Sequence, residues 1–188
     1  EWYSVFNNGG GTGDQEGNSV LQTSDGGYAI VGRRHSNYQS DAWVIKTDSN
    51  GTEEWNQTYG GNDHDTGYSI KQTEDNGYIL CGQTDSFGNG SNDIFLVKTD
   101  SVGNEIWHQT FGGNNWEIGM SLQITNDGGY VITGSTNSYG NGNDDVFVVK
   151  TNSEGIELWS HTYGGNDSDN GLSIQQTIDN GFIITGST

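Results

Sequence analysis

The chain has 188 residues, of which only 29% are hydrophobic and 31 are glycine. This composition suits many short strands and tight turns better than a thick helical core. Six Lys and Arg residues stand against 25 Asp and Glu residues, which gives a formal net charge of −19. Such a surface repels nucleic acid and anionic lipid, so neither is expected as a partner. No apolar run approaches the roughly 20 residues of a membrane-spanning helix, so no membrane insertion is expected.

The chain is built from one repeated unit. Tryptophans recur about 52 residues apart, at Trp2, Trp55, Trp107 and Trp159, and an aromatic residue after each Gly-rich turn keeps nearly the same period. A fixed period of this length marks solenoids, propellers or arrays. No stretch falls outside the period, so the sequence predicts a single domain over residues 1–188. Its repeats run approximately over 1–54, 55–106, 107–158 and 159–188.

Each repeat carries the local signals of four β-strands. Short runs rich in β-branched and aromatic residues lie between clusters of Gly, Asn and Asp, and no window shows helical spacing of apolar residues. In the second repeat we expect strand A at 67–73, strand B at 78–84, strand C at 93–99 and strand D at 105–111. Four antiparallel strands in such a unit are typical of a propeller blade. The sequence therefore predicts an all-β fold, a β-propeller of four-stranded antiparallel blades with roughly 3.6 blades in this chain.

The two ends of the chain do not complete a blade. The first residues, EWYSVF, match strand D, and the last residues, GFIITGST, match strand B. We expect fifteen strands, and the leading strand D would need a strand C that the chain does not supply. The chain is therefore expected to be part of a larger ring, completed by further blades or by another copy. The strand-B edge near Thr188 should be unpaired, and the apolar face beside it should lose its partner.

The turns carry two family resemblances. Between strands A and B every repeat has T-x-D-x-G followed by an aromatic residue, which resembles the Asp-box of propeller hairpins, a structural motif. Between strands C and D stand TDSNGTEEW, TDSVGNEIW and TNSEGIELW. These resemble the Trp-docking motif of propellers of the pyrroloquinoline-quinone dehydrogenase type, in which the Trp packs between blades. The resemblance implies the architecture, and no residue here can be matched to a quinone site.

The wider repeat is similar to tandem arrays in secreted and surface proteins of bacteria and archaea. That similarity implies an extracellular or cell-surface location. Three of the six basic residues, Lys46, Lys98 and Lys150, end strand C in successive repeats, which predicts a structural ion pair with a hairpin Asp. Cys81 is the only cysteine, and we expect a packed, buried thiol in strand B.

Motifs of catalysis are missing. The sequence has no G-x-S-x-G, H-E-x-x-H, C-x-x-C or P-loop, and its four histidines occupy four different repeat positions. Propeller enzymes gather residues from several blades, so an active site would not need such a motif. The sequence leaves enzyme status open and leans against it.

The loops between strands D and A are rich in carboxylates and suggest a calcium site. A carboxylate two residues before the closing Gly is an oxygen ligand that calcium accepts. The EF-hand version fails, because its sixth position is Tyr68 where Gly is needed. A looser calcium site remains one reading, and capping of the turn by Asp and Asn is the other. The candidate ligands are Asp63, Asp65, Glu117, Asp167 and Asp169.

The loops between strands B and C are the long ones, and in a meander they lie on the same face as the D–A loops. Each offers one aromatic residue amid Asn, Ser and Gly, and each leads into strand C through an Asp. Aromatic rings beside polar side chains suit a glycan or a protein ligand. In the alternative reading the rings anchor the loops on the neighbouring blade. The candidate ligand-binding residues are Tyr38, Phe87, Tyr139, Trp116, Asp41, Asp93 and Asp145.

Two functions remain. The first is a non-catalytic propeller that binds a glycan or protein, or assembles with further blades, through the D–A and B–C loop face. The second is a fragment of a propeller enzyme, a quinone-dependent dehydrogenase or a glycan-cleaving enzyme. The first is favoured because the loops repeat, whereas an active site needs different residues for different roles. No cofactor is certain, and calcium is the one candidate.

Overall fold

The computed structural model describes residues 14–36 and 39–188. The strand expected at residues 1–6 and the candidate residue Tyr38 lie outside the described residues. Fourteen strands are present in the described part of the chain. They form four separate sheets, three of four strands and one of two strands.

Each sheet is an antiparallel meander in chain order. The first sheet holds β1 (Gln15–Gln22), β2 (Tyr28–Ser36), β3 (Gln39–Thr47) and β4 (Glu53–Tyr59). The second holds β5 (Asp65–Gln72), β6 (Tyr78–Thr84), β7 (Asp93–Thr99) and β8 (Glu105–Phe111). The third holds β9 (Glu117–Ile124), β10 (Tyr130–Thr136), β11 (Asp145–Thr151) and β12 (Glu157–Tyr163). The last sheet holds β13 (Asn170–Gln176) and β14 (Phe182–Ser187).

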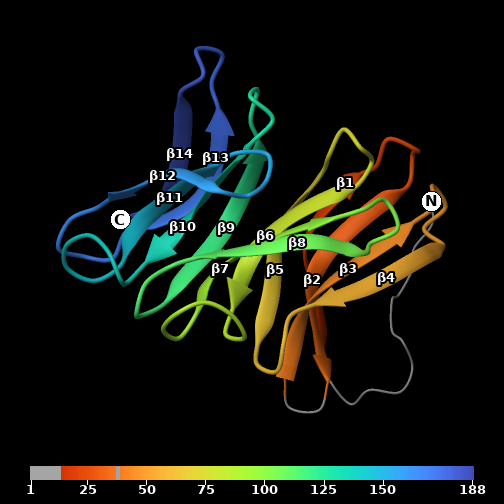
Figure 1. Cartoon of the computed structure of the whole chain (residues 1–188), viewed down its shortest axis with the longest axis horizontal. Coiled ribbons are helices and arrows are strands. Elements are labelled where there is room, and N and C mark those ends of the chain that lie inside the picture. Colours follow the sequence, from red (N-terminus) through yellow and green to blue (C-terminus); the bar gives the residue numbers. More distant parts are fainter. Residues whose placement is uncertain (1–13, 37–38) are drawn as a thin grey trace.

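The sheets follow one another from the red end of the chain to the blue end (Figure 1). The prediction of an all-β chain of repeated four-stranded antiparallel units is confirmed. Strands B, C and D of the second repeat have the predicted bounds, as β6, β7 and β8. Strand A begins two residues earlier than predicted, at Asp65, because Asp65 and Thr66 pair with the last two residues of β6.

The core lies between the sheets, because strand C sends alternate side chains to its two neighbours. Between the first and second sheets, which we call the first interface, Phe95 and Val97 of β7 pack on Ala42 and Val44 of β3. The other face of the same strand, Ile94 and Leu96, packs against the third sheet. We call the contact between the second and third sheets the second interface. Side chains at the matching positions of β11 fill it: Phe147 and Val149.

The strand-D tryptophans of the first and second sheets, Trp55 and Trp107, each pack against the C–D turn of the next sheet. A Cβ added at Gly103 would lie 2.7 Å from the ring of Trp55, and φ of Gly103 is +83°. The turn therefore needs glycine both for its backbone conformation and for the close approach of the ring. The hydroxyl of Tyr59 also donates a hydrogen bond to the carbonyl of Gly103, at 2.8 Å. Trp107 makes the same contact with Gly155.

The predicted ion pairs are present in all three complete sheets. The strand-C lysine reaches the Asp of the A–B hairpin at 2.9 Å in each case: Lys46–Asp25, Lys98–Asp75 and Lys150–Asp127. The lysines are buried, whereas the carboxylates remain more than half exposed. The pairs tie the end of strand C to the A–B hairpin, which leads into the neighbouring strand B.

One further expectation can be compared with the described residues. Cys81 is fully buried in β6, as predicted, and burial raises the pKa of its thiol. No helix in the described part of the chain is long and apolar enough to cross a membrane.

Candidate functional site

The B–C and D–A loops lie at the same end of the sheets and touch one another. The B–C loop of the second repeat is wedged between two D–A loops. On one side Ser86 accepts hydrogen bonds from the backbone of Gly61 and Asp63. On the other side the backbone of Ser91 donates to Asn115 at 2.9 Å. The loop face is therefore one continuous surface built from successive repeats.

The buried carboxylates of this face cap their own loops. Each accepts a hydrogen bond from the backbone N–H four residues earlier, and none is more than 8% exposed. A short polar side chain that closes a loop in this way supports the capping interpretation. The five carboxylates with this contact are Asp65, Asp93, Glu117, Asp145 and Asp169.

The structure brings carboxylates from neighbouring sheets together in pairs. Asp93, at the start of β7, and Glu117, at the start of β9, both reach over Gly112, where a Cβ would overlap oxygens of both side chains. Burial, together with the charge of Glu117, raises the pKa of Asp93 to about 6. Asp145 and Asp169 meet in the same way over Gly164.

The carboxylate pair at the first interface, Asp41 and Asp65, leaves buried oxygens without hydrogen-bond partners among the described residues. Burial and the nearby charge of Asp65 raise the pKa of Asp41. One buried oxygen on each of Asp41 and Asp65 has no hydrogen-bond partner among the described residues. The sequence assigned one member of each pair to ligand binding and the other to calcium. Their pairing depends on which loops meet between sheets, and the repeat alone did not show it.

The five predicted calcium ligands do not converge on a single site. They are distributed over three inter-sheet loops, and Asp63 and Asp167 are exposed. Among the residues that the structure describes, no group of three or more His, Cys, Asp or Glu side chains is arranged to hold a metal ion.

The candidate aromatic residues make contacts within the chain. The Phe87 ring stacks on His108 at 4.6 Å between centroids and packs on the first core cluster. Tyr139 donates a hydrogen bond from its hydroxyl to the carbonyl of Gly112 at 2.8 Å, while its side chain remains 46% exposed. These contacts anchor the B–C loops, which is the alternative role considered for the rings. Trp116 is half-buried, and its backbone pairs with Asn92.

A shallow hollow remains beside Tyr139 on the loop face. It measures about 340 Å³ and offers amide and hydroxyl groups next to the partly exposed ring. Polar groups around an aromatic ring suit a ligand rich in hydroxyl groups. The residues of this loop hollow are Asn89, Gly112, Gly113, Asn114, Asn115, Ser138 and Tyr139.

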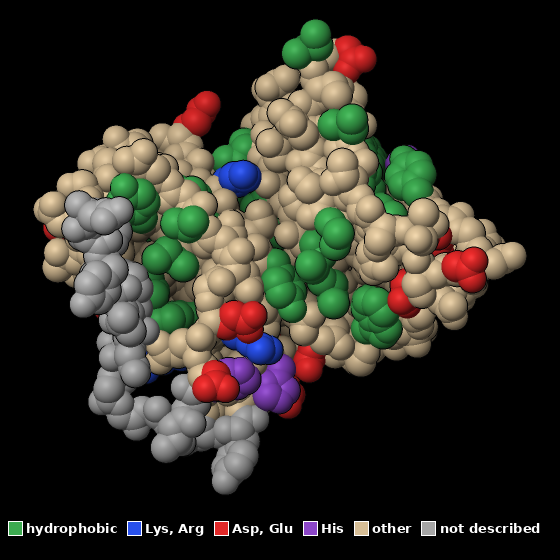
Figure 2. Space-filling model, turned by 180° about the vertical axis from the view of Figure 1, so that it is seen from behind, with side chains coloured by type: hydrophobic (Ala, Val, Ile, Leu, Met, Phe, Trp, Pro, Cys, Tyr) green, Lys and Arg blue, Asp and Glu red, His purple; other side chains and the backbone are tan. Residues whose placement is uncertain are grey.

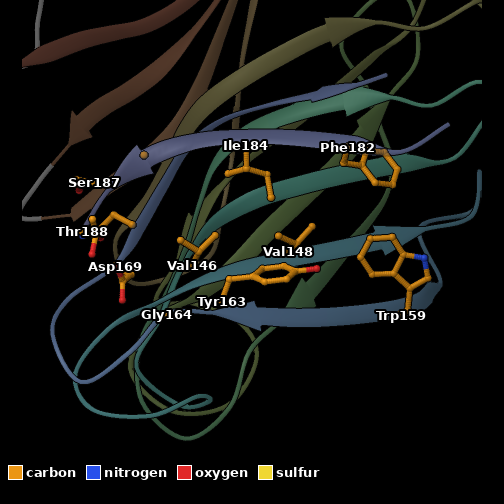
Figure 3. A pocket seen from close by; sticks show the side chains of 12 residues that line it. Val146, Val148, Trp159, Tyr163, Gly164, Asp169, Phe182, Ile184, Ser187 and Thr188 are labelled. Atoms are coloured by element: carbon orange, nitrogen blue, oxygen red, sulfur yellow. The ribbon is translucent and has the colours of Figure 1, made fainter. Parts of the chain in front are cut away.

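A larger and more apolar groove lies between the third sheet and the last one. It measures about 660 Å³, and side chains of β14 face those of β11 and β12 across it (Figure 3). We call it the terminal groove. Its apolar lining consists of Val146, Val148, Trp159, Tyr163, Phe182 and Ile184. The expected apolar face near the last strand is thus a defined groove, whose shape the sequence did not give.

Aromatic residues at the equivalent position, the end of strand D, show how open the terminal groove is. Tyr59 ends β4 at the first interface and is 4% exposed, and Phe111 in the same position at the second interface is 7% exposed. Tyr163 ends β12 in the terminal groove and is 55% exposed.

Hydrophobic side chains also reach the surface in several places, and basic side chains are sparse on the face shown in Figure 2.

Comparison with known proteins shows a partial similarity to a regulatory protein. No protein-family model matches the chain. The chain is similar to the regulatory protein FlaEY of Caulobacter vibrioides (strain ATCC 19089 / CIP 103742 / CB 15), with 28% identity over 109 residues. This similarity covers 50% of the present chain and spans only 11% of FlaEY.

Proposed function

We propose that the chain is a non-catalytic binding or assembly module of the β-propeller type, located outside the cell or on its surface. Three successive four-stranded sheets with tryptophans between them support the propeller architecture. The resemblance of the repeat to secreted arrays supports the location. The function consists in holding a protein partner rather than in chemistry.

The observation that carries this function is the terminal groove. An uncovered apolar surface rimmed by polar residues is typical of a protein-binding site. Asp169, Asn170, Ser187 and Thr188 supply polar groups at its rim. The groove is larger than the loop hollow, and it contains an aromatic side chain that lacks cover, Tyr163.

Binding of a neutral apolar dye tests whether the groove is open in solution. The full chain should bind Nile red, and Ile184→Asp should remove most of the fluorescence gain, because Ile184 lines the groove. Ile106→Asp is the matched control, because Ile106 is already 56% exposed on β8. Circular dichroism should show that both variants keep their strands. Equal dye binding by the two variants would contradict the proposed function.

The loop hollow supports a second candidate function, binding of a glycan at the loop face. The partly exposed Tyr139 ring and the neighbouring Asn side chains provide stacking and hydrogen bonding. On a glycan array, Tyr139→Ala should abolish any signal. Tyr139→Phe keeps the ring and should retain it. A signal that survives the removal of the ring would rule out this hollow as the binding site.

A further inference from the structure

We infer that the terminal groove is the seat of a C–D β-hairpin of this same repeat, bound as the third and fourth strands of the last sheet. The inference rests on the proposed function and names its partner. The occupant is a strand pair with the sequence pattern of β7–β8, supplied by another repeat.

The two enclosed interfaces provide the template for this occupant. In each of them, a Phe and a Val from strand C of the following sheet fill the space that the terminal groove leaves open. At the first interface Phe95 and Val97 lie among Val44, Tyr59 and Leu80. The groove presents side chains of similar kind at the same repeat positions: Val148, Tyr163 and Ile184. A hairpin that offers Phe and Val in the same register therefore fits it.

The strand-D residues of the third sheet occupy the positions that contact a C–D turn at the two enclosed interfaces. Trp159 lines the groove, whereas Trp55 and Trp107 each lie against the turn glycine of the following sheet. Tyr163 would donate its hydroxyl to the turn carbonyl of the occupant, as Tyr59 donates to Gly103. A β7–β8 hairpin carries this turn glycine in a positive-φ conformation.

The last sheet also offers a free strand edge. In the second sheet β6 pairs with β5 on one side and with β7 on the other. In the described residues β14 pairs only with β13. An exposed edge accepts an added strand through main-chain hydrogen bonds, while alternate side chains enter pockets. Strand C of the occupant would pair with β14 as β7 pairs with β6.

Charge complementarity points to the same occupant. Three A–B hairpins hold a strand-C lysine through their Asp: Asp25, Asp75 and Asp127. The fourth hairpin has the same Asp, Asp179, without a lysine partner among the described residues. The lysine that ends strand C of the occupant, the equivalent of Lys98, would reach Asp179.

A second intact copy of the chain is a poorer occupant. Its three C–D hairpins are already hydrogen-bonded to strands B of their own sheets. Donating one of them would open an enclosed core. The groove therefore calls for a hairpin that is not committed to its own sheet.

The test uses the full chain and a synthetic peptide of residues 92–111. Calorimetry should show binding, and a peptide with Phe95→Ser and Val97→Ser should bind at least about tenfold more weakly, because it loses the two apolar anchors. Ile184→Asp in the chain should weaken binding to a similar extent. Ile106→Asp should leave it unchanged.

A double-mutant cycle tests the charge contact. Asp179→Asn in the chain and Lys98→Gln in the peptide should each weaken binding a few-fold, and the two changes together should cost no more than one alone. Fully additive effects would contradict the proposed register.

An isolated hairpin is marginally stable in water, so a fused form is tested as well. Residues 85–111 are attached after Thr188, which keeps the B–C loop of the repeat as the connection. Backbone amides of β14 should exchange at least about tenfold more slowly with deuterium than in the parent chain. The fusion with Phe95→Ser and Val97→Ser should exchange like the parent.

The outcomes separate this inference from the proposed function. If both fusions exchange alike and both peptides bind alike, the hairpin is not the occupant. The same holds if the chain self-associates through Ile184 and the peptide does not compete. Dye binding that depends on Ile184 would leave the proposed function standing in either case. If the parent chain does not bind the dye, both the proposed function and this inference are overturned.

Discussion

The second interface and the terminal groove use the same repeat positions with opposite results. At the second interface Ile132 is fully buried and Phe111 is 7% exposed. At the groove Ile184 is only partly buried and Tyr163 is 55% exposed. The difference lies in strand C of the following sheet, which fills the second interface and has no counterpart at the groove among the described residues. The repeat therefore encodes half of each interface, and stability depends on the neighbour that provides the other half.

Truncation of equivalent isoleucines should show the largest difference. Ile132→Ala removes a fully buried side chain from an enclosed cluster and should cost about 2–5 kcal/mol of unfolding free energy. Ile184→Ala at the groove should cost less than half as much, because its surroundings are already open. Urea unfolding of both variants measures the difference. Similar losses would show that the two interfaces are equally well packed.

Substitution of turn glycines sharpens the comparison at the tryptophan contact. Gly103→Ala meets both a positive φ and the Trp55 ring, and should cost about 2–4 kcal/mol. Gly128→Ala has a similar positive φ but no atom within 4 Å of the added Cβ, and should cost only about 1 kcal/mol. Thermal unfolding measures both variants. An equal loss would mean that the ring moves aside without penalty.

The carboxylate pair at the second interface predicts a pH dependence. The pKa of Asp93 is about 6 in the folded chain, above its ordinary value of 3.8. Its contribution to stability is therefore fully present below about pH 3.8 and is lost as the pH rises through about 6. Asp93→Asn should remove this loss and keep the oxygen that accepts from Asn89. Unfolding at pH 5 and pH 8 should differ less in the variant than in the parent.

The hairpin carboxylates should show a smaller effect of opposite sign. Thr73 and Lys98 lower the pKa of Asp75 to about 2. Its contribution is present above about pH 3.8 and is lost as the pH falls through about 2. Asp75→Asn should cost at most about 1 kcal/mol at pH 7, because the carboxylate is exposed. Asp179→Asn, at the hairpin whose Asp has no lysine partner among the described residues, should cost less, and chemical unfolding would detect a reversed order.

The sequence determined the elements that depend on local chemistry. Alternation of apolar residues and the turn residues located β6, β7 and β8 to the residue. The repeated lysine gave the ion pair with the hairpin Asp, because both positions recur in each unit. The start of β5 was placed two residues late, because its first residues extend only by pairing with the end of β6.

The tertiary structure decided what lies between the repeats. It paired Asp93 with Glu117 over Gly112, and it turned Phe87 inward onto His108. It also gave the terminal groove its lining from two different sheets. A period in the sequence states what recurs along the chain, whereas these contacts depend on which loop or strand of one repeat meets the next. Local propensity fixes the unit, and only the packing of units in space fixes the surfaces available for binding.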